Sequence, residues 1–162
     1  MKASERIWFD GKFIPWDDAK IHVAAHVVQY GSSVFEGIRC YETRGGPAVF
    51  CLGPHIRRLQ DSCKIFRMAL AYSAEQISKA CVDTVSTNGH QSCYIRPLVF
   101  RGVESWSVEP RRSPLHMAIM TIEWGRYLGP EAIEQGVDVM VSSWRRMAPD
   151  THPGMGKIGG NY

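Results

Sequence analysis

The order in which strand-like and helix-like hydrophobic patterns follow one another is the feature of this sequence that most constrains its fold. Strand-like segments come first, two helix-like segments follow, and two more strand-like segments come after them. Asp10-Gly11 separates the first two strand-like segments, and such a pair supplies the positive backbone angles of a tight hairpin turn. This order predicts an α+β domain in which a largely antiparallel sheet carries two helices on one face.

The expected strands fall into three pairs. The first is a hairpin over residues 7–16, with Pro15 on an edge strand because proline cannot donate to a sheet ladder. The second covers residues 34–41 and 48–52, and the third covers residues 92–101 and 115–123. A segment rich in proline, serine and arginine, residues 104–114, is predicted to be a loop.

Spacings of three and four between apolar residues predict two helices between these strands. The first begins near Pro54, and its apolar residues are Ile56, Leu59, Cys63 and Phe66. The second begins after Ser73, which has Gln76 three residues later in a capping-box pattern. Asn88-Gly89 is a typical stop for that helix.

The pattern changes after the last of these strands. We expect a small domain over residues 1–122, an interdomain linker over residues 123–134, and the start of a cofactor-binding domain over residues 135–162. Val137, Val139 and Val141 alternate with other residues and predict a strand. A Gly-rich segment follows, and we interpret the remainder of this second domain as absent. We expect residues after about 135 to be mobile or covered by a neighbouring chain.

Composition and charge exclude several classes of protein. The 44% apolar and 22% charged residues are typical of a globular protein, and a net charge of +3 without a basic stripe disfavours nucleic-acid binding. The sequence has no secretory signal and no apolar run of the ~20 residues that a membrane helix needs. Its five cysteines include no C-x-x-C pair, which disfavours a zinc site and a disulfide framework. A cytoplasmic protein with reduced thiols is expected.

Lys157, within GMGKIGGNY, is the most suggestive candidate for chemistry. Glycines let a backbone approach a ligand closely, and a partly deprotonated lysine can form an imine. Taken alone, a lysine in a Gly-rich loop is more often a solvated surface residue. A nucleotide-binding P-loop is disfavoured because Thr151 and Ile158 occupy positions where its pattern requires Gly and Ser or Thr. His22 and His26 have helical spacing but no further ligand nearby, so no metal site is predicted.

Several segments, taken together and in order, resemble one known family. They are HVVQYGSSVFEGIRCY, HIRRLQDS, SCYIRPLVF, EWGRYLG and VSSWRRMAP followed by GKIGGNY. The chain resembles the N-terminal half of branched-chain amino-acid aminotransferases, which are fold-type IV pyridoxal-phosphate enzymes, from about Ile7 to Tyr162. EGIRCY, YIRPL and K-x-x-G-N-Y are specific in combination, whereas each alone is not.

The resemblance implies roles for individual residues. Lys157 would bind the aldehyde of pyridoxal 5'-phosphate and then move a proton between the substrate Cα and the cofactor C4′. Tyr162 would hydrogen-bond the phenolic oxygen of the cofactor, and Arg58 would contact its phosphate. Arg96 would receive the distal carboxylate of glutamate, and Arg39 would have a supporting role. The other positions matched to the substrate pocket are Tyr30, Phe35, Gly37, Tyr94, Trp124 and Tyr127.

The implied reaction is a ping-pong transamination of L-leucine, L-isoleucine or L-valine with 2-oxoglutarate. The resemblance also implies a homodimer or higher homo-oligomer. It places the acid that faces the pyridine nitrogen in the part of the family that follows Tyr162, so a chain ending there is expected to be inactive or nearly so. Alternatives are a D-amino-acid aminotransferase, an aminodeoxychorismate lyase, a fragment that only folds and associates, and an RNA-binding domain.

Overall fold

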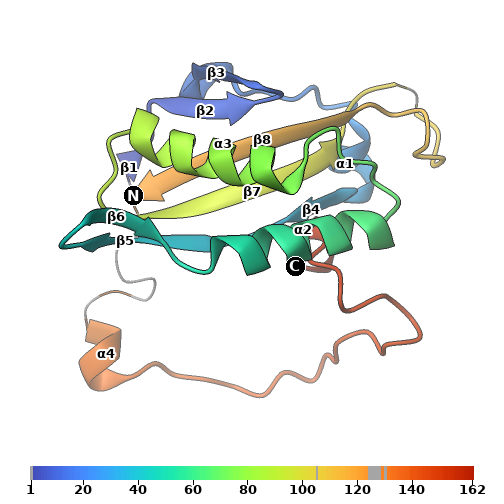
Figure 1. Ribbon diagram of the computed structural model, residues 1–162. Helices are drawn as coiled ribbons and strands as arrows, with labels where there is room; N and C mark the ends of the chain where they lie inside the picture. The colour runs from blue at the N-terminus through green and yellow to red at the C-terminus, as the bar shows by residue number, and fades with distance from the viewer. Residues whose placement is uncertain (1, 105, 124–128, 130) are drawn as a thin grey trace.

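A computed structural model of the chain describes residues 2–104, 106–123, 129 and 131–162. Within these residues, one eight-stranded sheet is covered on one face by two long helices, α2 and α3 (Figure 1). The strands are β1 (Lys2–Ala3), β2 (Arg6–Phe9), β3 (Lys12–Pro15), β4 (Ser33–Phe35), β5 (Ile38–Thr43), β6 (Gly46–Val49), β7 (Cys93–Arg101) and β8 (Leu115–Glu123). The helices are η1 (Trp16–Asp18), α1 (His26–Tyr30), α2 (Leu52–Ile65), α3 (Ala74–Thr87), α4 (Glu131–Gln135) and η2 (Gly159–Asn161).

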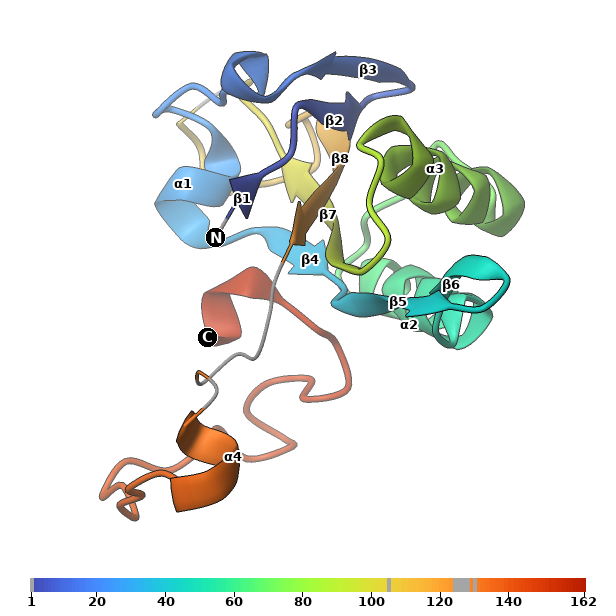
Figure 2. The same cartoon turned by 90° about the vertical axis from the view of Figure 1, so that its left-hand side faces the viewer.

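The main strand order is β3-β2-β8-β7-β5-β6, with β1 beside β8 and β4 beside β7. Every strand pair among the described residues is antiparallel. The order of strands, two helices and strands therefore forms the predicted α+β arrangement. Figure 2 shows α2 and α3 together on one side of the sheet.

The first hairpin forms as its sequence predicts. Asp10 and Gly11 have φ values of 45° and 93°, and positive values at both positions match the turn that a two-residue hairpin prefers. The hairpin pairs Arg6 with Pro15, and β3 is an edge strand. An edge position suits Pro15 because it cannot donate to a second neighbour.

The helix predictions are also confirmed. Ser73 accepts a hydrogen bond from the Gln76 amide, and the Gln76 side chain accepts one from the Ser73 amide, so the capping box is complete. Asn88 ends α3, and Gly89 follows with a φ of 66°. The apolar stripes of α2 and α3 pack on the central strands. The core includes Ile38, Ile56, Leu59, Ile77, Cys81, Ile95 and Ile119, all of them at most 1% exposed.

The strand predicted around Val139 is wrong. Residues 136–142 form no strand, and Val139, Met140 and Val141 are each about nine-tenths exposed. A strand needs a neighbour for its N–H and C=O groups, and neither edge of the sheet, β3 or β6, pairs with this segment. Figure 1 shows the extended segment running beneath the sheet and returning to it near α2.

The end of the chain packs against β4. Ile158 forms an antiparallel bridge with Val34, and the Lys157 carbonyl accepts a 3.0 Å hydrogen bond from the Phe35 amide. The Lys157 segment therefore packs on β4 of its own chain. Across the described residues, no helix is long and apolar enough to cross a membrane.

Candidate active site

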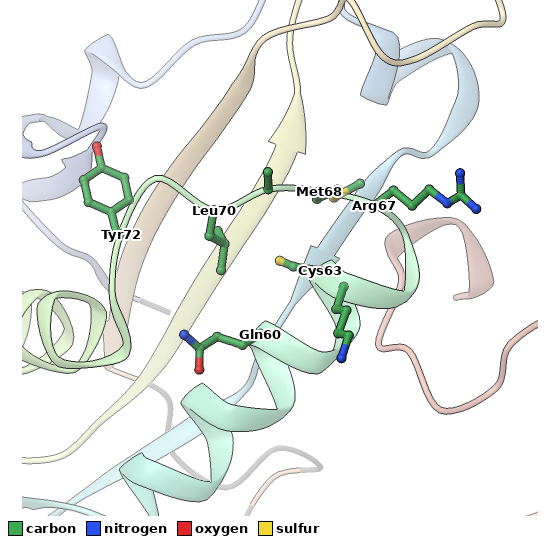
Figure 3. Close-up of a pocket in the computed structure, with 8 residues that line it drawn as sticks. Gln60, Cys63, Arg67, Met68, Leu70 and Tyr72 are labelled. Atoms are coloured by element: carbon green, nitrogen blue, oxygen red, sulfur yellow. The ribbon is translucent and has the colours of Figure 1, made fainter.

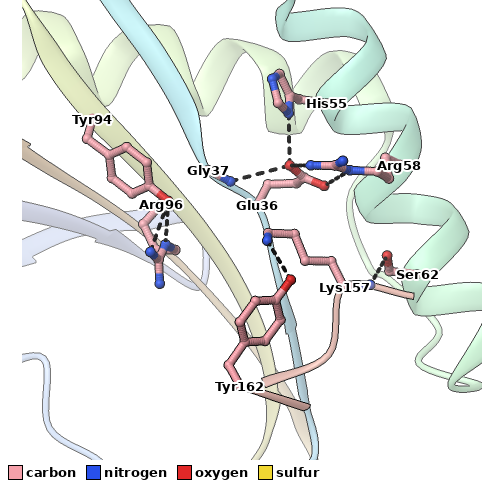
Figure 4. A network of polar contacts seen from close by, with 9 residues as sticks. All are labelled: Glu36, Gly37, His55, Arg58, Ser62, Tyr94, Arg96, Lys157 and Tyr162. Carbon is pink, nitrogen blue, oxygen red and sulfur yellow. Dashed lines mark hydrogen bonds and ion pairs between the residues drawn. The ribbon is translucent and has the colours of Figure 1, made fainter. Parts of the chain in front are cut away.

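The backbone of Lys157 is held between a strand and a helix. Its carbonyl accepts from the Phe35 amide of β4, and its amide donates a 3.0 Å hydrogen bond to the Ser62 hydroxyl of α2. Ser62 is completely buried. These two bonds fix where the side chain of Lys157 begins, and Figure 4 shows the one to Ser62.

The glycines around Lys157 allow the segment to approach α2 and β4 closely. A Cβ on Gly156 would lie 2.4 Å from the ring of Phe66, and one on Gly159 would lie 2.2 Å from the Ser33 hydroxyl. A larger residue at either position would push the segment away. The sequence indicated close approach to a ligand, whereas the observed close approach is to α2 and β4.

The amino group of Lys157 lies against two aromatic rings. Its Nζ donates a 3.0 Å hydrogen bond to the Tyr162 hydroxyl and lies 4.5 Å from the centre of the Phe35 ring. That hydrogen bond is the largest cause that lowers the pKa of the Tyr162 phenol, and the charges of Lys157, Arg146 and Arg58 act in the same direction. The pair therefore places an amine beside a phenol that ionises more readily than usual.

Lys157 and Tyr162 line a hollow of about 350 Å³ that is rich in basic groups. Arg58 comes from α2, while Arg146 comes from the extended segment before Lys157. Arg146 also lies 5.8 Å from the centre of the Tyr162 ring. Two guanidinium groups and one amine in a single hollow favour an anionic ligand.

A buried carboxylate holds one of these guanidinium groups. Glu36, which is 0% exposed, accepts from Arg58 Nε at 2.5 Å and Nη2 at 2.7 Å, and it bonds His55 Nδ1 at 2.8 Å. Burial raises the pKa of the Glu36 carboxyl, but the hydrogen bonds from Arg58 and His55 outweigh it, so the net pKa is lowered. Glu36 also raises the pKa of Arg58.

Three further predicted residues, Arg96, Tyr94 and Gly37, lie close to Phe35. The Arg96 guanidinium lies 4.6 Å from the Phe35 ring centre, and its Nη2 donates a 2.9 Å hydrogen bond to the Tyr94 hydroxyl. The Tyr94 hydroxyl packs closely on Gly37, since a Cβ at that position would lie 2.1 Å from the hydroxyl oxygen. The Phe35 ring thus lies close to both the Arg96 guanidinium and the Lys157 amine.

The remaining predicted residues are less closely placed. Tyr30, at the end of α1, donates from its hydroxyl to the Trp106 carbonyl at 3.4 Å, and within the described residues it makes no hydrogen bond or ring contact with Phe35. Trp124 and Tyr127 lie outside the described residues. Arg39 lies 5.6 Å from the ring centre of Tyr41.

Sequence reasoning missed four residues of this site: Glu36, His55, Ser62 and Arg146. His55 bonds the Glu36 carboxylate at 2.8 Å. Two signals were available. Glu36 lies between two predicted pocket residues, and His55 and Arg58 are three apart, which places them on one face of a helix.

A separate hollow of about 510 Å³ lies beside the C-terminal end of α2 (Figure 3). Cys63, Met68 and Tyr72 contribute to its wall, and it does not include Lys157 or Arg58. Burial raises the pKa of the Cys63 thiol to about 12, so the thiolate needed for nucleophilic chemistry is not formed there at neutral pH.

The chain belongs to the Amino-transferase class IV family, which it matches over residues 33–158. It is 48% identical over 162 residues to the branched-chain-amino-acid aminotransferase of Escherichia coli (strain K12), covering 99% of this chain and 52% of that protein. A crystal structure of the Escherichia coli enzyme is also similar, with a TM-score of 0.93 at 47% identity. The similarity covers 98% of this chain and 52% of the chain in that structure.

A second similar structure is that of a T.th. branched-chain amino acid aminotransferase complexed with N-(5'-phosphopyridoxyl)-L-glutamate. Its TM-score is 0.90 at 40% identity, over 99% of this chain and 52% of that one. The chain therefore spans about half the length of the relatives it matches, and the match includes the whole of β4, α2 and the Lys157 segment.

Proposed function

We propose that the whole protein transfers the amino group of L-leucine, L-isoleucine or L-valine to 2-oxoglutarate, using pyridoxal 5'-phosphate bound to Lys157. The observation that carries this proposal is the position of Lys157. Its amine contacts Tyr162 at the wall of a basic hollow and shares the Phe35 ring with Arg96. The names of the relatives at 48% identity support the substrate class.

The residues of the hollow fit this cofactor. Pyridoxal phosphate presents an aldehyde, a phenolic oxygen and a phosphate, and the hollow offers an amine, a phenol and guanidinium donors. Lys157 would hold the aldehyde carbon, and Arg58 would bind the phosphate. Tyr162 would hydrogen-bond the phenolic oxygen. The similar T.th. enzyme was crystallised with a phosphopyridoxyl group joined to glutamate, which supports the same choice.

The bound cofactor supplies the electron sink for the electrons released at the substrate Cα. The protein supplies orientation and proton transfer. The Lys157 amine would accept the proton from Cα and return it, and it is placed for this by its backbone bonds to Ser62 and Phe35. The Tyr162 hydroxyl, with its lowered pKa, is a neighbouring hydrogen-bond partner for that amine.

One pocket must accept an apolar side chain in one half-reaction and a carboxylate in the other. Phe35 offers an apolar surface, while the Arg96 guanidinium beside it offers charged donors. Arg96 is already oriented by the Tyr94 hydroxyl. This supports Arg96 as the group that binds the distal carboxylate of 2-oxoglutarate and glutamate.

The proposal includes a homodimer or higher homo-oligomer located in the cytoplasm. Trp106 and Val108 lie in the loop between β7 and β8 and are exposed apolar residues. Their exposure supports a surface that another subunit would cover. The free thiols of all five cysteines support a reducing compartment.

A comparison of the rates with three substrates tests this function within the family. The initial rates of the purified whole protein with L-leucine, D-alanine and aminodeoxychorismate should differ by at least about tenfold in favour of L-leucine with 2-oxoglutarate as acceptor. A faster reaction with D-alanine would assign a D-amino-acid aminotransferase instead, and release of product from aminodeoxychorismate without an acceptor would assign a lyase.

A further inference from the structure

Glu36 is a completely buried carboxylate whose hydrogen bonds are all made within one small network. It accepts from Arg58, pairs with His55, and accepts a 3.3 Å bond from the Gly37 amide. A buried charge is costly unless partners of opposite charge and hydrogen bonds compensate it. Three partners, two of them on α2 and one just before β5, provide that compensation.

The network restricts the side chain of Arg58. This arginine projects from the surface of α2, and its side chain is 52% exposed, so without a partner it would exchange among several rotamers in water. The Glu36 carboxylate bonds Nε and Nη2 together, which sets both the direction and the plane of the guanidinium. Within the described part of the chain, the third nitrogen, Nη1, makes no hydrogen bond, and Arg58 lines the Lys157 hollow.

We propose that Glu36 is a positioning residue that holds the Arg58 guanidinium at the wall of the Lys157 hollow, ready to bind the phosphate of the cofactor. The inference rests on the proposed function, because it concerns the same hollow. The negative charge of Glu36 also weakens the attraction of Arg58 for an anion. Holding the guanidinium in place contributes more to phosphate binding than the charge of Glu36 takes away. The reason is that Arg58 is half exposed, so a guanidinium without a partner would turn towards water.

The experiment compares a ligand that carries the phosphate with one that lacks it. Dissociation constants of pyridoxal 5'-phosphate and of pyridoxal are measured by absorption titration for the unmodified protein, Glu36→Gln, Arg58→Met and the double variant. Glu36→Gln should weaken binding of pyridoxal phosphate by roughly fivefold, the amount expected when one long side chain must be ordered on binding. Binding of pyridoxal should change by less than about twofold.

The double variant separates positioning from general damage. If Glu36 acts through Arg58, adding Glu36→Gln to Arg58→Met should cause no further loss of affinity for pyridoxal phosphate. Arg57→Met is the matched control, because it removes the neighbouring exposed arginine of α2 and should leave both affinities unchanged. If Glu36→Gln does not fold, His55→Ala takes its place, with a phosphate-specific loss of about twofold expected.

The possible results have distinct meanings. Equal weakening of both ligands would show that Glu36 only maintains the fold, and unchanged or tighter binding of pyridoxal phosphate would show that charge dominates; either result overturns the proposal. The same holds if His55→Ala, tested in its place, leaves the ratio of the two affinities unchanged. If the unmodified protein binds neither ligand, the proposed function itself fails.

Discussion

The Nζ of Lys157 and the hydroxyl of Tyr162, five residues apart, are joined by a 3.0 Å hydrogen bond beside the ring of Phe35. The short 3₁₀ helix η2 between them turns the chain back, so that the phenol faces the amine. Neither side chain depends on a distant element to find the other. Their relation to Arg58 and Arg96, by contrast, depends on the docking of this segment onto β4 and α2.

The first prediction concerns ionisation of Tyr162. Replacing Lys157 by Met removes the hydrogen bond and the positive charge that favour the phenolate, so the pKa of Tyr162 should rise. Ultraviolet titration, with Tyr162→Phe subtracted to isolate this one phenol, measures the change. Lys64→Met on α2 is the control and should leave the titration unchanged. A fall in the pKa of Tyr162 would contradict the cause assigned here.

Ser62 should control the order of the lysine segment. Ser62→Ala removes the acceptor of the Lys157 amide and leaves that donor without a partner inside the protein. Such a loss costs about 1–3 kcal/mol of local stability, so hydrogen exchange at the Lys157 amide should be about fivefold faster or more. Ser86→Ala, an exposed change on α3, should leave that exchange rate unchanged. Unchanged exchange in Ser62→Ala would mean that the segment is held by other contacts.

Gly37→Ala should disturb Arg96 through Tyr94. The new methyl would overlap the Tyr94 hydroxyl, so the ring must move and Arg96 loses its partner. The displaced atoms are the end of a side chain, so we expect a destabilisation of about 1 kcal/mol, at the low end for overpacking, measured by urea unfolding. The KM for 2-oxoglutarate should rise more than the KM for leucine. Gly53→Ala, which meets no atom within 4 Å, is the control.

Arg96→Met should separate the two half-reactions. Loss of the guanidinium removes the proposed partner of the distal carboxylate, which is worth at least about 1.5 kcal/mol, so kcat/KM for 2-oxoglutarate should fall at least about tenfold. The half-reaction with leucine should change much less, because its side chain has no charge. Single-turnover absorption measurements follow each half-reaction separately. An equal loss in both would show that Arg96 supports the pocket rather than reading the carboxylate.

Local signals in the sequence predicted several individual elements of the fold. Asp10-Gly11 determines its turn through backbone angles alone, and the Ser73–Gln76 capping box acts within one helical turn. The strand expected around Val139 failed for the opposite reason. Alternation describes which side chains could face a core, but a strand also needs a paired neighbour, and none lies beside this segment in the described part of the chain.

The candidate site was predicted only in part. Lys157, Tyr162 and Arg58 were identified through family resemblance, and the structure brings them to one hollow. Glu36 was missed because its role depends on tertiary structure. An acid between β4 and β5 is unremarkable in sequence, and it becomes a buried partner only when α2 places His55 and Arg58 over it. The spacing of His55 and Arg58 places them on one face of α2, but it does not show which carboxylate they bind.

The central claim is that Lys157 binds the cofactor covalently. The direct measurement is the visible absorption spectrum of the purified protein with pyridoxal phosphate, before and after borohydride reduction, followed by peptide mass analysis. We predict a visible band that reduction fixes to the peptide containing Lys157, and that is missing in Lys157→Ala but present in Lys64→Ala. A band of equal strength in Lys157→Ala, or a reduced adduct on another lysine, would contradict the account.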